Sequence, residues 1–122
     1  MNLVPIRGFQ ICECGKAYVV TYSQFIELIK NRMLTDYAEH IFETDSRKNE
    51  VIATKYAFIN ALLKVIEKHK DIYQNSTIRR QSIIHAVRTH ENNLKFLKGY
   101  KEKYFEFLVL IGLPQQTDNG FI

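Results

Sequence analysis

Two cysteines near the start of the chain are the residues best suited to binding a metal ion. Cys12 and Cys14 are separated by one residue and followed by Gly15, which is half of a zinc-knuckle pattern. A complete zinc site needs four ligands, and the chain has only two cysteines. The missing ligands would have to be histidines or the same two cysteines of a second chain. A pair of structural thiols at the end of a strand is the simpler interpretation, so we expect no cofactor, with zinc at Cys12 and Cys14 as the alternative.

The histidines do not complete such a site in an obvious way. The chain has four of them, His40, His69, His85 and His90. His85 and His90 are five residues apart, which separates their side chains by about 140° on a continuous helix, whereas helical metal pairs are three or four residues apart. A cysteine nucleophile would also need a histidine base and an orienting group, and no local pattern supports one. Without a glycine-rich phosphate loop or a nucleophile elbow, we expect that the protein is not an enzyme.

Basic residues are the second group that could bind a ligand. The net charge is +4, and it is divided as −1 over residues 1–44, +2 over residues 45–75 and +3 over residues 76–122. The residues that could contact a nucleic-acid backbone are Arg79, Arg80, Arg88, Lys95 and Lys98. Acidic residues are interleaved with them, which weakens the pattern. Nucleic-acid binding by the second and third helices is therefore the alternative function.

Apolar residues recur every three or four positions along most of the chain, as in amphipathic helices. The pattern predicts three principal helices, over residues 23–43, 47–73 and 77–113. Ser23, and either Ser76 or Thr77, carry side-chain oxygens suited to capping the first and third helices. An unbroken third helix would be roughly 55 Å long, against about 35 Å for a compact domain of this size. It must therefore break near His90–Asn93 or project toward a partner.

His90 lies in a polar part of the third predicted helix, yet on a helical wheel it points into the apolar sector. A histidine in this position is usually a core or boundary residue that hydrogen-bonds to a neighbouring helix. The functional alternative is a polar site or a pH-sensitive contact, because histidine changes its charge near neutral pH.

The first part of the chain predicts a β-hairpin over residues 8–21. Strands Phe9–Cys12 and Ala17–Thr21 are rich in β-branched and aromatic residues, and Gly15 supplies the turn. The fold class is thus mostly α with a small hairpin, in a single domain with a hairpin over 1–22, a helical core over 23–113 and a flexible tail over 114–122. With no run of about 18 apolar residues and no signal peptide, we expect a soluble cytoplasmic protein that does not enter a membrane.

The most apolar run of the chain is Phe105–Ile111, FEFLVLI. As a helix it is hydrophobic on nearly every side except at Glu106, and such a helix must be buried all round. A homodimer solves this, because each copy covers the other. The predicted interface consists of Tyr104, Phe105, Leu108, Leu110 and Ile111. The alternative is a monomer in which the hairpin covers the end of the helix. The sequence therefore favours a small non-enzymatic regulator or inhibitor that acts on another protein and forms a homodimer.

Overall fold

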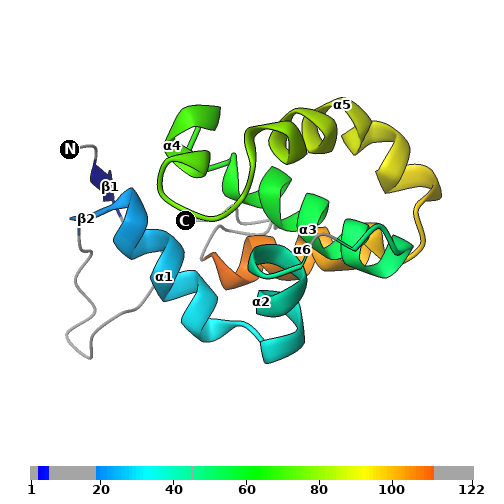
Figure 1. Cartoon of the computed structure of the whole chain (residues 1–122), viewed down its shortest axis with the longest axis horizontal. Helices are drawn as coiled ribbons and strands as arrows, with labels where there is room; N and C mark the ends of the chain where they lie inside the picture. Colours follow the sequence, from blue (N-terminus) through cyan, green and yellow to red (C-terminus); the bar gives the residue numbers. More distant parts are fainter. Residues whose placement is uncertain (1–2, 6–18, 45, 112–122) are drawn as a thin grey trace, which may run out of the picture.

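The computed structural model describes residues 3–5, 19–44 and 46–111, and this part of the chain is mostly α-helical (Figure 1). The described residues form six helices: α1 (Tyr22–Arg32), α2 (Thr35–Phe42), α3 (Asn49–Leu62), α4 (His69–Tyr73), α5 (Arg80–Phe96) and α6 (Tyr100–Leu110). The expected mostly helical fold class is confirmed.

Two short strands precede the helices. β1 (Leu3–Pro5) pairs antiparallel with β2 (Val19–Thr21), with Leu3 opposite Thr21 and Pro5 opposite Val19. Most of the hairpin predicted over residues 8–21, including Gly15, lies outside the described residues, as does the tail predicted over 114–122. The strand pair lies at one end of the molecule, beside the start of α1 (Figure 1).

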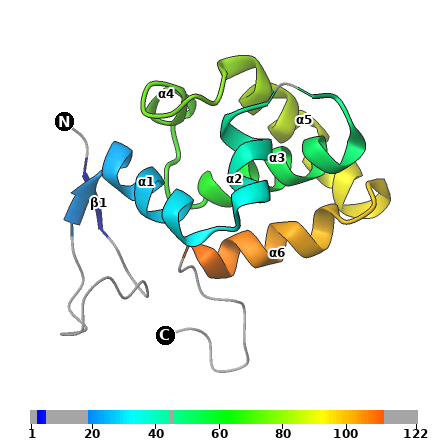
Figure 2. The same cartoon turned by 60° about the horizontal axis from the view of Figure 1, so that its bottom comes forward.

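Each of the three predicted helices is divided in two. The first is interrupted at Met33 and Leu34, whose backbones are extended, and the second is interrupted between Leu62 and His69. The third ends at Phe96 and resumes at Tyr100 after Gly99, which has a φ of 82°. The break predicted near His90–Asn93 is therefore misplaced, because those residues lie inside α5. The turn at Gly99 folds α6 back along the molecule, so the two helices fit within a compact domain (Figure 2).

The helix caps also differ from those predicted. Thr21, rather than Ser23, begins α1: its Oγ1 accepts a hydrogen bond from the Gln24 amide at 3.1 Å, and the Gln24 side chain accepts one from the Thr21 amide at 2.9 Å. This reciprocal pair is a capping box. The N-cap of α5 is Arg79, which makes no side-chain cap hydrogen bond. Ser76 and Thr77 instead donate to the carbonyl oxygens of the preceding segments.

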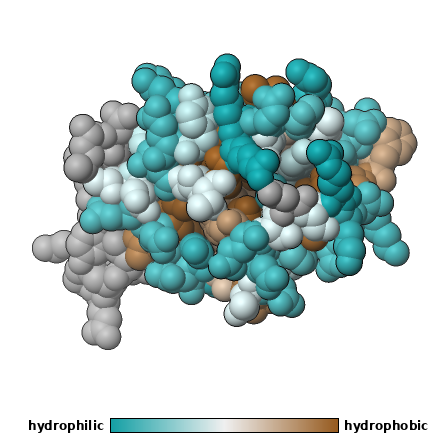
Figure 3. All heavy atoms as spheres, in the orientation of Figure 1, coloured by the Kyte–Doolittle hydropathy of each residue, from teal (hydrophilic) through white to brown (hydrophobic). Residues whose placement is uncertain are grey.

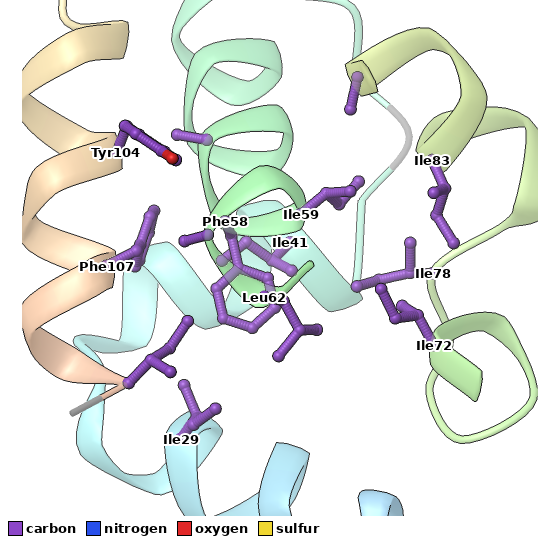
Figure 4. Close-up of a cluster of buried hydrophobic side chains, with 14 of the residues drawn as sticks. Ile29, Ile41, Phe58, Ile59, Leu62, Ile72, Ile78, Ile83, Tyr104 and Phe107 are labelled. Atoms are coloured by element: carbon purple, nitrogen blue, oxygen red, sulfur yellow. The ribbon is translucent and has the colours of Figure 1, made fainter. Parts of the chain in front are cut away.

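Helix α3 lies at the centre and contacts α2, α5 and α6 (Figures 1 and 2). Nine of its 14 residues are buried, which explains why its apolar pattern is broader than one stripe. Ala53, Ala57 and Ala61 repeat every four residues and leave room for a neighbouring helix to approach. All six helices contribute to one hydrophobic cluster, in which Phe58 and Leu62 lie between α6 and the α4–α5 side of the core (Figure 4).

The end of α6 is anchored in this cluster by aromatic contacts. The ring of Phe107 makes edge-to-face contacts with Phe58, at 5.4 Å between centroids, and with Tyr37, at 5.5 Å. Such geometry is the favoured arrangement of aromatic pairs. One side of α6 is thereby covered within its own chain.

Candidate functional site

Helix α6 has a buried face and an exposed face. Tyr104, Phe107 and Ile111 are buried against the core. Phe105 and Val109, which are four residues apart and so share a face, are 41% and 59% exposed. These two large apolar side chains point away from the core, where charged residues such as Glu102 and Glu106 are also exposed.

The predicted interface is consequently divided by the fold. Tyr104 and Ile111 are buried within their own chain, so they cannot form the surface of an interface as predicted. Leu108 and Leu110 are partly buried against the core, and Phe105 is exposed. The prediction underestimated how much of the run α3 and its neighbours cover. It also omitted Val109, the most exposed apolar residue of α6.

An apolar groove of about 370 Å³ adjoins this exposed face. It forms where the extended link between α1 and α2 passes the last turns of α6. Its lining residues are Arg32, Met33, Leu34, Tyr37, Glu106, Phe107, Val109 and Leu110. Leu34 is 69% exposed, so both walls of the groove present large apolar side chains to solvent. The sequence did not indicate that Leu34 is exposed, because its apolar side chain fits the spacing of the first predicted helix.

Contacts between α2 and α6 hold the groove in shape. The Tyr37 hydroxyl donates a hydrogen bond to Glu106 Oε2 at 3.1 Å. Burial raises the pKa of Tyr37, and the adjacent Glu106 carboxylate raises it further. Lys103 Nζ lies 6.0 Å from the centre of the Tyr37 ring, within the range of a cation–π contact. The polar residues of the groove therefore help to position its apolar walls.

A second candidate site is a polar network in the core between α3, α5 and α6. Asn60 Nδ2 donates to the Tyr100 hydroxyl at 3.0 Å and to the Ala86 carbonyl at 2.9 Å. The same hydroxyl lies 2.5 Å from His90 Nδ1. Asn60 Nδ2 also lies 3.0 Å from the Tyr56 carbonyl oxygen, so its two protons are shared among three acceptors. When His90 is neutral and unprotonated at Nδ1, the Tyr100 hydroxyl donates to this nitrogen. His90 is thus hydrogen-bonded to a neighbouring helix, as the sequence indicated.

Burial governs the electrostatics of this network. It raises the pKa of Tyr100, so this hydroxyl keeps its proton. Burial lowers the pKa of His90; Glu91 raises it and Lys64 lowers it. A neutral His90 is what the hydrogen bond from Tyr100 requires. A pocket of about 260 Å³ beside His90 is also lined by Lys64, Glu67 and His69.

The predicted nucleic-acid contacts, Arg79, Arg80, Arg88, Lys95 and Lys98, are all exposed. On α5, however, Arg80, Arg88 and Lys95 share their side of the helix with Glu91, since these positions lie within about 80° of one another on the helical wheel. The carboxylate interrupts the positive stripe. Hydrophilic residues cover most of the face in Figure 3, with hydrophobic residues in small patches between them.

The metal prediction concerns residues that the structure does not describe, because Cys12 and Cys14 fall within residues 6–18. Within the described ranges, no three histidine, cysteine, aspartate or glutamate side chains gather as metal ligands. His85 and His90 do point to different sites, as their spacing predicted: His85 lines a pocket with Arg79, and His90 faces α6.

Sequence reasoning missed Asn60 and Tyr100, although a lone amide in the apolar segment from Ala57 to Leu63 was a detectable signal. It also missed that Arg47 and Arg79 line the same pocket, because 32 positions separate them in the chain. Of the helices that the structure describes, none combines the length and apolar character needed to cross a bilayer. Comparison of the chain with protein-family models, with curated proteins and with solved structures finds no match.

Proposed function

We propose that this protein is a non-enzymatic interaction protein that binds a second copy of itself through the exposed side of α6. We call this surface the α6 face and define it by Leu34, Phe105, Val109 and Leu110. The observation that carries the proposal is the exposure of Phe105 and Val109 on the solvent side of the helix, next to an apolar groove. Monomeric proteins rarely expose large contiguous apolar patches.

A second copy is the occupant that best matches this surface. The projecting side chains and the groove adjoin one another, so two copies related by a two-fold axis can each insert apolar side chains into the groove of the other. Arg32 and Glu106 both line the groove, so the same two-fold relation can pair opposite charges across the interface. Fully burying a large apolar side chain is favourable by roughly 1.5–3 kcal/mol, and each contribution occurs twice in a symmetric dimer.

The test replaces one exposed apolar residue of the α6 face by lysine. Val109→Lys should convert a dimer into a monomer, because the interface would bury two charges without partners. The matched control is Phe96→Lys. Phe96 is 76% exposed at the end of α5 and does not line the groove. Sedimentation velocity of both variants, at a concentration where the unmodified protein is dimeric, measures the effect.

A second substitution distinguishes the loss of the interface from the loss of the fold. Leu34→Lys lies on the opposite wall of the groove, outside any helix, and should also give a monomer while the circular dichroism of the helices is kept. The proposal is wrong if Val109→Lys and Leu34→Lys both sediment like the unmodified protein. It is also wrong if the control, Phe96→Lys, dissociates the dimer to the same extent as they do.

A further inference from the structure

The pocket beside His90 brings buried polar groups and apolar side chains together. It encloses about 260 Å³ between α3, α5 and α6, and the segment that joins α3 to α4 also borders it. Leu63 and Val87 supply its apolar walls. None of its lining residues belongs to the groove beside α6, so this site is separate from the α6 face.

The amide of Asn60 leaves a buried acceptor at this pocket. Asn60 is 8% exposed, and its Nδ2 donates to the Tyr56 and Ala86 carbonyl oxygens. Because backbone carbonyl oxygens only accept, the NH2 group must face them, and Oδ1 lies on the other side of the amide. No residue that the structure describes donates a hydrogen bond to this oxygen. A buried acceptor normally has a partner, so we expect a donor from water or from a ligand at Asn60 Oδ1.

Tyr104 supplies a second buried polar atom. This residue is 7% exposed and lines the pocket, and Figure 4 shows its hydroxyl oxygen directed from α6 toward α3. Its ring packs against the rings of His90, at 4.9 Å between centroids, and of Tyr100, at 6.4 Å. Its hydroxyl makes no hydrogen bond with the described part of the chain. The contacts of the ring therefore position a hydroxyl group that has no partner in the core.

Both of these atoms are accessible from the pocket. Among the described residues, His40 Nδ1 is the one fully enclosed side-chain nitrogen or oxygen without a hydrogen-bond partner. Asn60 Oδ1 and the Tyr104 hydroxyl are therefore open to a small molecule, although more than nine-tenths of each residue is buried. Ligand pockets typically combine apolar walls with a few polar groups of this kind.

Three further side chains complete the polar lining. When His90 is neutral and accepts from Tyr100 at Nδ1, its proton is on Nε2, which is then a donor. Lys64 and Glu67 lie in the segment that follows α3, and both are exposed. Among the described residues, no ion pair joins these two charges to each other or to another side chain. The pocket thus presents hydrogen-bond donors with a positive charge, and acceptors with a negative charge.

We propose that this pocket binds a free amino acid with an apolar side chain. The ammonium group of this zwitterion requires acceptors, which the Asn60 oxygen and the Glu67 carboxylate supply. Its carboxylate requires donors, which the Tyr104 hydroxyl and the Lys64 ammonium group supply. The side chain of the ligand would lie against the apolar walls. Pockets for drug-sized ligands enclose roughly 300–1,000 Å³, so a pocket of about 260 Å³ suits a smaller molecule of this class.

The experiment is a titration of the isotope-labelled protein with L-leucine, L-valine and L-methionine, followed by amide chemical shifts. Two analogues of leucine each lack one charge: 3-methylbutylamine has no carboxylate, and 4-methylpentanoate has no ammonium group. We expect saturable shifts of the amides around Asn60, His90 and Tyr104. Each analogue should bind at least about tenfold more weakly than leucine, as expected for the loss of hydrogen bonds to a charged group.

Two substitutions of exposed residues test the two charges separately. Lys64→Gln should weaken the binding of leucine and of 4-methylpentanoate about two- to fivefold, the effect of a solvent-exposed ion pair, and should leave 3-methylbutylamine unchanged. Glu67→Gln should weaken leucine and 3-methylbutylamine and should leave 4-methylpentanoate unchanged. The matched control is Lys70→Gln, which removes an exposed lysine of α4 that does not line the pocket.

Tyr104→Phe tests the buried hydroxyl while the ring is kept. Because this hydroxyl makes no hydrogen bond with the described residues, its loss should not lower the stability to urea, but it should weaken leucine binding about tenfold. The proposal is overturned if none of the three amino acids gives saturable shifts, or if leucine and its two analogues bind equally well. It is also overturned if Tyr104→Phe binds leucine like the unmodified protein, or if Lys70→Gln weakens binding as much as Lys64→Gln.

Discussion

At the scale of single residues, the Tyr100 hydroxyl joins three helices. It accepts from Asn60 of α3 and lies against His90 of α5, while its own ring is buried on α6. A buried hydroxyl without partners would be costly, so these contacts specify how α6 docks on the other two helices. This polar network within the core therefore fixes the position of α6 relative to α3 and α5.

Tyr100→Phe should therefore lower the free energy of unfolding by about 1–1.5 kcal/mol, because His90 Nδ1 loses its hydrogen-bond partner, whereas Asn60 Nδ2 still has the Tyr56 and Ala86 carbonyl oxygens as acceptors. The matched control is Tyr37→Phe, which removes an exposed hydrogen bond to Glu106 and should change stability by no more than about 0.5 kcal/mol. Urea denaturation followed by circular dichroism measures both. Equal effects of the two substitutions would show that the buried network has no special role.

The lowered pKa of His90 predicts that acid destabilises the fold. In the unfolded chain a histidine takes up a proton near pH 6.5, whereas the folded state resists protonation of His90. The unfolded state then binds more protons, so stability falls as the pH drops below about 6.5. Above that pH both states are neutral at this position, and His90 makes no contribution to the pH dependence.

The measurement compares urea midpoints at pH 7.5 and pH 5.0 for the unmodified protein and for His90→Gln. Glutamine retains an acceptor for the Tyr100 hydroxyl but does not titrate. The other three histidines are present in both proteins, so the difference isolates His90. The variant should lose less stability at pH 5.0 than the unmodified protein; an identical loss would mean that His90 does not resist protonation.

At the scale of elements, short interruptions convert three predicted helices into six. The link at Met33 and Leu34 separates α1 from α2 and forms one wall of the groove. The turn at Gly99 reverses the chain between α5 and α6. Both interruptions position the α6 face, so the breaks determine which apolar residues reach solvent.

Gly99→Ala should destabilise the protein by about 1–2 kcal/mol, because Gly99 has a φ of 82°, where a Cβ is unfavourable. An added Cβ would lie 3.5 Å from Lys103 Nζ, an ordinary contact, so the effect would come from the backbone alone. Gly99→Asn should cost less, since asparagine adopts left-handed conformations more readily. Thermal unfolding of the unmodified protein, Gly99→Ala and Gly99→Asn gives the order of their stabilities. Equal stability of the unmodified protein and Gly99→Ala would show that the turn does not require a glycine.

The sequence predicted the helical class well because the apolar spacing of the helices survives in the fold. It failed at Met33 and Leu34, where apolar residues continue the helical spacing through a break that tertiary packing imposes. Gly99 was a visible signal for the turn, whereas the polar run around His90–Asn93 was not, because these residues remain helical. Glu91 and Asn92 are exposed, while His90 contacts Tyr100 and Asn93 is buried. The pocket of Arg47 and Arg79 could not be predicted, since it depends on how α3 packs against α5.

At the scale of the whole molecule, the α6 face is built on the single hydrophobic cluster to which all six described helices contribute. The α6 face adjoins the link between α1 and α2. Helix α3 contacts both α5 and α6, so it supports the helix that carries this face. Self-association is the central claim, because it gives the exposed apolar residues of α6 a role.

The most direct test of that claim is the mass of the unmodified protein by light scattering over a range of concentrations. The chain has a mass of 14.4 kDa. We predict about twice this mass at around 100 μM, a concentration at which a dimer of micromolar affinity persists, with a decrease toward the monomer mass on dilution. A mass of 14.4 kDa at around 100 μM would contradict the account.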